Sequence, residues 1–182
     1  MSRIHTPDSI EDAPEASQPL LRNVEKLLGT VPNMFRLIGN SPAALEGYLG
    51  INGALGKGRL DARTRERIAL AVAAVNGCSY CLAAHTYLGR NLAKLGEEEI
   101  AANRRGTSLD PKADAAVRFA VAIVESRGHV DGDAIARMRS AGYADAEIVE
   151  VVAHVALNTL TNYVNEVFGT AVDFPAVEAV AA

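Results

Sequence analysis

Residues 65–85 read RERIALAVAAVNGCSYCLAAH, and this stretch decides how the chain folds. From Ile68 to Val75 it is apolar on every face, which is typical of a helix that is buried on all sides. Asn76-Gly77 ends that helix, and a second helix begins at Cys78. We therefore expect two consecutive helices joined by a tight turn, with both cysteines of the chain at the start of the second.

The sequence around this stretch keeps a helical period and shows no alternating, strand-like pattern. Proline, glycine and capping residues mark where the helices begin and end. The expected helices cover residues 20–28, 42–55, 62–75, 78–95, 97–103, 111–126, 131–138 and 147–168, with a short apolar turn or helix at 33–38. Residues 1–18 lack an apolar period and are expected to form an N-terminal tail, and 19–182 a single domain. The predicted fold is all-α, with about eight helices.

The composition is that of an ordinary globular protein. Of 182 residues, 49% are apolar and 22% are charged, and 22 acidic against 18 basic side chains give a net charge of −4. This charge offers no basic surface for nucleic-acid phosphates or anionic lipids, so neither is an expected partner. The sequence contains no run of about 18 apolar residues, the length that a membrane span needs. Its N-terminus lacks the pattern of a secretory signal. We expect a cytoplasmic protein, in which two cysteines three positions apart are more often catalytic or metal-binding than structural.

The two cysteines have the placement of a redox-active pair. At a helix start, unpaired N–H groups and the helix dipole favour negative charge, so thiolate character is expected to rise at Cys78. Cys81 lies on the same face, and the two Cβ atoms of a regular helix are then about 5–6 Å apart, against about 3.8 Å in a disulfide. A bond between them tightens the first helical turn, so we expect it to be exchangeable rather than permanent.

Two further residues are placed to move protons. His85 follows Cys81 by four residues on the same face, where its imidazole can take or return the thiol proton. In an antiparallel helix pair, Glu66 comes about ten residues before the turn and His85 about eight after it, a difference of about 3 Å along the helix axis. A carboxylate in that place orients the imidazole and raises its basicity. The sequence therefore predicts a Glu66–His85–Cys81 proton relay.

Other assignments fit parts of the same pattern. Cys78 and Cys81 can be small buried hydrophobes, with His85 a core histidine. The Cys-x2-Cys-x3-His spacing also supplies zinc ligands, with Glu66 or water as the fourth, although no second Cys or His pair stands at zinc-finger spacing.

Three groups of residues outside this pattern are expected to be structural. The last long helix carries a polar stripe that consists of Glu150, His154, Asn158 and Asn162. We expect this stripe to form a hydrogen-bonded seam between helices or subunits rather than to line a cavity. Tyr80 is expected to pack against a neighbouring helix rather than to bind substrate. We expect a solvated helix face made of Arg63, Arg65 and Arg67, one of which can pair with Glu66.

The set of Glu66, Cys78, Cys81 and His85 resembles the active-site signature of alkylhydroperoxidase D, within the carboxymuconolactone decarboxylase-like superfamily. Cys78 follows Glu66 by twelve positions, Cys81 follows Cys78 by three, and His85 follows Cys81 by four. The strong match spans residues 65–89. A weaker likeness to the peroxidase-related branch is carried by Val31-Pro32-Asn33, Ser41-Pro42-Ala43-Ala44-Leu45 and Asp173-Phe174-Pro175. In one departure, the prototype has a histidine between its cysteines where this chain has Ser79-Tyr80.

The resemblance implies an all-α fold and a thiol-dependent peroxidase or disulfide oxidoreductase that reduces small organic hydroperoxides. It implies that Cys81 attacks the peroxide, that Cys78 resolves the resulting sulfenic acid to a disulfide, and that Glu66 and His85 relay protons. Neither a metal nor a cofactor beyond the thiols is expected. A homo-oligomer (dimer, trimer or hexamer) is also implied, and because there is no third cysteine, a lipoyl or thioredoxin-like dithiol must reduce the disulfide. The alternatives are a carboxymuconolactone decarboxylase-like lyase, or a zinc-binding or redox-sensing helical protein without peroxidase turnover.

Overall fold

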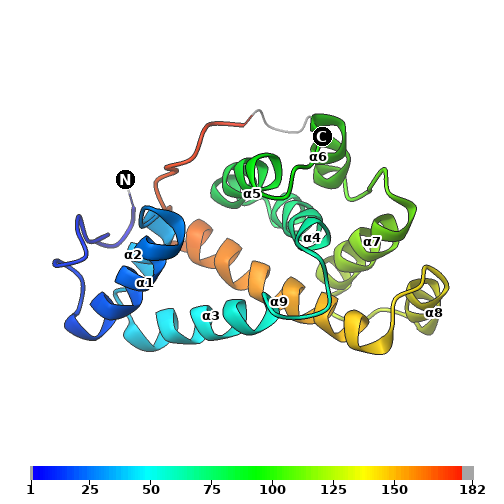
Figure 1. The fold of residues 1–182 in the computed structure, drawn as a ribbon, viewed down its shortest axis with the longest axis horizontal. Coiled ribbons are helices and arrows are strands. Elements are labelled where there is room, and N and C mark those ends of the chain that lie inside the picture. The colour runs from blue at the N-terminus through cyan, green and yellow to red at the C-terminus, as the bar shows by residue number, and fades with distance from the viewer. Residues whose placement is uncertain (1, 178–182) are drawn as a thin grey trace.

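The computed structural model of the chain describes residues 2–177, and these form helices and no strand (Figure 1). The elements are the 3-10 helix η1 (Glu15–Ser17) and the α-helices α1 (Gln18–Leu28), α2 (Asn33–Ile38), α3 (Pro42–Leu55), α4 (Ala62–Val75), α5 (Ser79–Asn91), α6 (Glu97–Arg104), α7 (Pro111–Ser126), α8 (Gly132–Ser140) and α9 (Asp145–Phe168). The predicted all-α class is confirmed. The described residues contain nine α-helices where about eight were expected, because residues 33–38 are a full helix.

Helix α4 lies at the centre of the fold. It packs against α5, α6, α7 and α9, and Figure 1 shows it surrounded by these helices. Its residues Ile68, Leu70 and Val72 are fully buried, as the apolar run on every face predicts. Two apolar clusters meet at this helix, one with α7, α8 and α9 and the other with α1, α2, α3 and α5. The second cluster contains both cysteines, so the site lies in the half of the core built around α5.

The turn between α4 and α5 fixes where the cysteines stand. The N–H of Cys78 donates to the carbonyl of Ala73 at 2.9 Å, and the N–H of Gly77 donates to the carbonyl of Ala74 at 3.1 Å. These two bonds close a Schellman motif, which requires a left-handed residue just after the helix. Gly77 has φ of +68°, a conformation that costs a residue with a side chain far more. Cys78 therefore ends the turn and is at once the N-cap of α5.

Several helix boundaries differ from the prediction, most clearly those of α5 and α9. Helix α5 ends at Asn91 rather than near residue 95, because the chain turns through Lys94, whose φ is +56°. This turn buries Ala93 and Leu95 against Leu70, which a continued helix would not do. Helix α9 begins at residue 145, two residues before the predicted start.

Both ends of the described chain pack against the helices. In the N-terminal segment, Pro7, Ile10 and Ala13 are buried, and α1 already begins at Gln18, inside the predicted tail. Near the other end, the carboxylate of Asp173 accepts the N–H of the first residue of α2 at 2.7 Å. The division into a tail of residues 1–18 and a domain of 19–182 stays a prediction, and its last five residues, 178–182, lie outside the described residues. Within residues 2–177, no helix combines the length and the apolar character that a membrane span needs.

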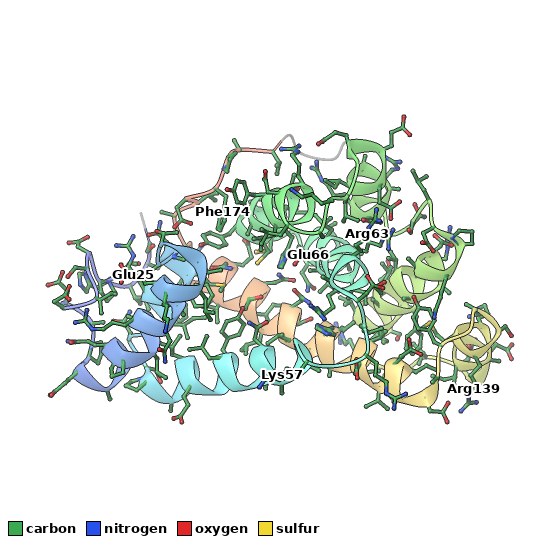
Figure 2. The ribbon with its side chains drawn as sticks, viewed as in Figure 1. Glu25, Lys57, Arg63, Glu66, Arg139 and Phe174 are labelled. Carbon is green, nitrogen blue, oxygen red and sulfur yellow. The ribbon has the colours of Figure 1, made fainter. Side chains whose placement is uncertain are left out.

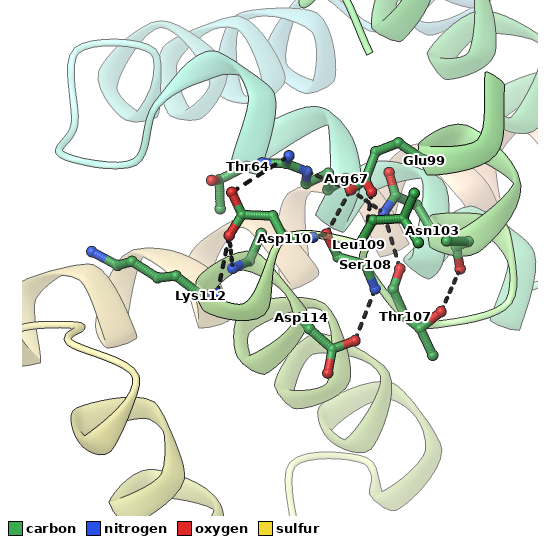
Figure 3. Close-up of polar contacts among 12 residues, drawn as sticks. Thr64, Arg67, Glu99, Asn103, Thr107, Ser108, Leu109, Asp110, Lys112 and Asp114 are labelled. Carbon is green, nitrogen blue, oxygen red and sulfur yellow. Dashed lines mark hydrogen bonds and ion pairs between the residues drawn. The ribbon is translucent and has the colours of Figure 1, made fainter. Parts of the chain in front are cut away.

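A buried ion pair ties α4 to α6 and to the start of α7 (Figure 3). The Nε of Arg67 donates to Oε1 of Glu99 at 2.7 Å, and both side chains are at most 9% exposed. Ser108, Asn103 and the N–H of Leu109 also donate to the Glu99 carboxylate. Burial by itself would raise the pKa of Glu99, but these hydrogen bonds outweigh it and bring the value to about 2. The expectation that Arg67 belongs to a solvated face is therefore wrong, since its helix is covered on that side by α6 and α7.

Candidate functional site

The two cysteines lie inside the core at the first turn of α5. Cys78 is fully buried, Cys81 is 2% exposed, and both are free thiols. The N–H of Cys81 donates to Sγ of Cys78 at 3.4 Å, so the side chain of Cys78 caps the helix. Cys81 is the third residue of the helix, where the N–H groups of the first turn have no partner within the helix. Both sulfur atoms thus stand next to the positive end of the helix dipole.

His85 and Glu66 meet across the α4–α5 pair. Nδ1 of His85 lies 2.9 Å from Oε2 of Glu66, and the two side chains are 20% and 22% exposed. Figure 2 shows Glu66 toward the middle of the view, whereas Lys57 and Arg139 lie at its edges. The hydrogen bond to the carboxylate orients the ring and leaves its other nitrogen, Nε2, free of Glu66; Cys81 lies one turn earlier on α5. The antiparallel pairing expected for these two helices brings the two residues together.

Helix α9 contributes two asparagine side chains that the sequence did not link to the cysteines. Nδ2 of Asn165 donates to Sγ of Cys81 at 3.2 Å. Asn162, one turn earlier on the same face, is fully buried, and its Oδ1 accepts a hydrogen bond from Asn76 at 2.8 Å. Asn162 belonged to the predicted polar stripe. Asn165 was not included, although it lies three residues further along on the same face, so helical spacing could have identified it.

Tyr48 of α3 is the second site residue that sequence reasoning missed. Burial, followed by the negative charges of Cys81 and Glu66, raises the pKa of Tyr48, so the phenol is neutral and lies near both groups. Its ring packs edge-on against Phe35 at 5.7 Å between centroids. No spacing rule connects residue 48 to the cysteines, because α3 reaches the site only through the tertiary fold.

The thiols are electrostatically unequal. Hydrogen bonding from Cys78, together with the positive charge of His85 and the amides of Asn165 and Asn162, outweighs burial and lowers the pKa of Cys81 to about 6. The same sulfur–sulfur hydrogen bond, with burial and the charge of Cys81, raises the pKa of Cys78. Thiolate character was expected at Cys78, the first residue at the helix start, but the structure favours the thiolate at Cys81.

The neighbours of His85 favour the charged form of its imidazole. Burial on its own lowers the pKa of His85, but the charge and hydrogen bond of Glu66, and then the charge of Cys81, raise it overall. The charged forms of Cys81 and His85 therefore stabilise each other in the first two turns of α5, and the Glu66 carboxylate is hydrogen-bonded to the imidazole. This arrangement can present a nucleophilic sulfur and return a proton to a leaving group.

The other residues considered from the sequence have structural roles. Glu150 accepts the N–H groups of Arg59 and Leu60, so this end of the stripe is the expected seam between α9 and the α3–α4 loop. The hydroxyl of Tyr80 accepts the N–H of Met34 at 3.3 Å, and its ring packs edge-on against Phe174, as expected of a packing residue. Figure 2 shows Phe174 beside α5.

No group of three or more His, Cys, Asp or Glu side chains in residues 2–177 is arranged to hold a metal ion. The zinc assignment thus has no support from the geometry of the described residues. A cavity of about 360 Å³ lies on the opposite face of α5, between α5, α6 and residues 175–177, and includes neither cysteine.

Comparison with known proteins agrees with this geometry. Residues 42–126, which contain all four residues of the predicted relay and cysteine pair, match the model of the carboxymuconolactone decarboxylase family. A peroxidase-related protein from Ralstonia eutropha JMP134, described as an alkylhydroperoxidase AhpD core, is similar over 94% of this chain and 92% of its own, with 25% identity and a TM-score of 0.83. The family match over residues 42–126 and the similarity of the whole fold together support the alkylhydroperoxidase D and carboxymuconolactone decarboxylase superfamily for this chain.

Two further structures show the fold of this superfamily. A peroxidase-related protein from Silicibacter sp. TM1040 has 24% identity and a TM-score of 0.81, covering 93% of this chain and 91% of its own. A cysteine-to-alanine variant of the debrominase Bmp8, in complex with 2,3,4-tribromopyrrole, has 21% identity and a TM-score of 0.79, covering 95% and 94%. A search of curated proteins finds no significant match. Proteins that share this fold thus include a debrominase as well as peroxidase-related proteins.

Proposed function

We propose that the protein is a thiol-dependent peroxidase, or disulfide oxidoreductase, that reduces small organic hydroperoxides through Cys81 and Cys78. The observation that carries this proposal is the geometry around Cys81: its N–H donates to Sγ of Cys78 at 3.4 Å, and Asn165 donates to its sulfur at 3.2 Å. The hydrogen-bonded pair of His85 and Glu66 lies one turn later on the same helix. The pKa of Cys81 is lowered to about 6 while that of Cys78 is raised, so one sulfur is a nucleophile and the other retains its proton. Because the thiolate is the reactive form, Cys81 is the peroxidatic residue.

In the first step, the Cys81 thiolate attacks the terminal oxygen of the hydroperoxide. The S–O bond forms as the O–O bond breaks, the peroxide is reduced to an alcohol, and Cys81 is oxidised to a sulfenic acid. The leaving alkoxide takes its proton from the imidazolium of His85, which Glu66 holds in place at 2.9 Å.

In the second step, Cys78 attacks the sulfur of the Cys81 sulfenic acid. A disulfide forms, the S–O bond breaks, and water leaves with the proton of the Cys78 thiol. His85, neutral after the first step, takes that proton and transfers it to the departing hydroxide. The N-cap position keeps Cys78 next to Cys81, and the hydrogen bond from Cys81 N–H to Cys78 Sγ already joins them.

The described surroundings of Cys81 favour a small organic substrate over a highly polar one. The cluster that holds the cysteines contains Met34, Leu45 and Ala84, with Tyr48 and Leu49 packed against it. An alkyl group can bury apolar surface here while its peroxide group meets the polar side chains of α5 and α9.

The catalytic cycle needs partners outside the chain. The protein has two cysteines only, and both are used, so an external dithiol of lipoyl or thioredoxin-like type must reduce the disulfide. We also propose a homo-oligomer, which is supported by an apolar stripe on the outer face of α9. Its exposed members are Val149, Val152, Leu160, Tyr163 and Val167. Light scattering on the purified protein checks this: a monomer at micromolar concentration contradicts it.

A lyase without redox chemistry is less well supported, because it gives no role to two adjacent thiols of opposite pKa shift. Mass spectrometry after one equivalent of an alkyl hydroperoxide tests the proposal. The expected product has lost two hydrogens and links Cys78 to Cys81, and Cys81→Ser abolishes it. The steady-state rate of hydroperoxide consumption is then measured with several dithiol donors, and 2,3,4-tribromopyrrole serves as the comparison substrate. Debromination of that compound without peroxide reduction would contradict the proposed activity.

A further inference from the structure

The side-chain amide of Asn162 has a hydrogen-bond donor that nothing in the described structure satisfies. Asn162 is fully buried, and its Nδ2 has no hydrogen-bond partner. Its Oδ1 accepts from Nδ2 of Asn76 at 2.8 Å, and Asn76 is the residue that ends α4, two positions before Cys78. In this arrangement Oδ1 of Asn162 is the acceptor, and its Nδ2 is the atom left without a partner.

The donor of Asn162 belongs to the surroundings of Cys81. Asn165, three residues later on the same face of α9, donates its Nδ2 to Sγ of Cys81 at 3.2 Å. The amides of both residues stabilise negative charge on that sulfur, which is one cause of its lowered pKa. Of the two amides, that of Asn165 makes a hydrogen bond to the sulfur, whereas Nδ2 of Asn162 makes none.

An unmet buried donor costs about 1–3 kcal/mol, so such a group is uncommon unless a ligand or water completes it. The proposed reaction brings two peroxide oxygens to this place: one leaves as the alkoxide, and the other is transferred to Cys81 and stays there. We propose that Asn162 is a further catalytic residue, whose side-chain amide donates a hydrogen bond to the oxygen that bonds to Cys81, while Asn165 holds the sulfur. This inference rests on the proposed peroxidase function.

The amide acts on the first step of the cycle. As the thiolate sulfur forms the S–O bond, the O–O bond breaks and its electron pair leaves with the alkoxide, which His85 protonates. The oxygen that stays on sulfur loses its bond to the alkoxide oxygen, keeps its hydrogen and becomes the oxygen of a sulfenic acid. A fixed, buried N–H donor aimed at that oxygen stabilises the charge that develops on it, as donors of an oxyanion hole do. No additional oxidant or reductant is required.

The test compares two reactions of Cys81 in a Cys78→Ser background, which stops the cycle at the sulfenic acid. Oxidation by an alkyl hydroperoxide, followed by trapping with dimedone, transfers an oxygen; alkylation by iodoacetamide does not. Asn162→Asp retains the acceptor for Asn76 and removes the donor, and Asn162→Ala removes both. Asn158→Ala is the matched control, because the Asn158 amide donates to the carbonyl of His154 on the same helix.

We expect both Asn162 variants to lower the oxidation rate at least about tenfold more than the alkylation rate, after correction for the measured thiolate fraction. The control should change both rates equally. If the two rates of the Asn162 variants fall together, Asn162 only tunes the thiolate and the inference is wrong. If Asn162→Asp does not fold, as judged by circular dichroism, the alanine variant decides. A Cys81 that reacts with iodoacetamide but not with the hydroperoxide in the Asn162-intact protein would overturn the proposed function, and the inference with it.

Discussion

Replacing Asn165 by alanine removes the hydrogen bond that reaches the sulfur of Cys81 at 3.2 Å. A hydrogen bond to a charged group contributes about 1.5–3 kcal/mol, which corresponds to about one to two pKa units for the group that it stabilises. The pKa of Cys81, now lowered to about 6, should therefore rise to about 7–8.

The consequence depends strongly on pH. At pH 7, a pKa of about 6 leaves about nine-tenths of Cys81 as thiolate, and the predicted rise leaves about half to one-tenth. The reaction of Asn165→Ala should therefore be about two to ten times slower than that of the wild type at pH 7. At pH 9 both proteins are almost fully thiolate, and their rates should nearly coincide.

The assay is the ultraviolet absorbance of the thiolate as a function of pH, together with the rate of alkylation by iodoacetamide. Because the pKa of Cys78 is raised, the transition at lower pH belongs to Cys81. Asn158→Ala serves as the control on the same helix and should leave the midpoint in place. An Asn165→Ala midpoint that does not move, or a loss of rate as large at pH 9 as at pH 7, would refute this account of the thiolate.

Three further predictions concern the groups around this site. Glu66→Gln removes the charge that raises the pKa of His85. Hydroperoxide turnover should therefore fall at least about tenfold, and the high-pH limb of its pH–rate profile should move to lower pH. A high-pH limb that does not move would argue against the relay. The folded-state pKa of Glu99, about 2 against 4.5, contributes about 3 kcal/mol that is present above pH 4.5 and is lost as the pH falls through about 2. Denaturant unfolding across this range should show that Glu99→Gln is less stable than wild type at pH 7 and loses less of its stability on acidification; parallel curves contradict this. Asp173→Ala takes the acceptor from the N–H of Asn33 and should destabilise the protein by about 1 kcal/mol, seen as a lower melting temperature, whereas an unchanged melting temperature would show that the bond is not stabilising.

Several features of the site follow from local sequence alone. The spacing of three and four residues puts Cys78, Cys81 and His85 on one face of one helix, because the helix repeats every 3.6 residues. The Asn76-Gly77 turn brings Glu66 back to that face, because a Schellman motif is a local structure with its own sequence preference. Each of these contacts joins residues fewer than twenty positions apart, so regular geometry is enough to predict them.

Other features depend on long-range packing. Asn165 lies 84 residues after Cys81 in the sequence, and no periodic pattern links the two. The lowered pKa of Cys81 follows from its hydrogen bonding with Cys78, and then from the charge of His85 and the amides of α9, which together outweigh burial. The sequence around Arg67, with two more arginines nearby, indicates a surface residue. In the folded protein α6 and α7 cover its side chain.

The amino-acid sequence by itself determined the helical class, the tight turn before Cys78 and the line of reactive groups along α5, since helix periodicity and turn chemistry act over a few residues. Only the tertiary structure decided which sulfur carries the charge, that Tyr48 and the amides of α9 surround it, and which arginine is buried. These outcomes depend on desolvation and on charges brought together from distant parts of the chain. A local sequence pattern cannot predict either of them.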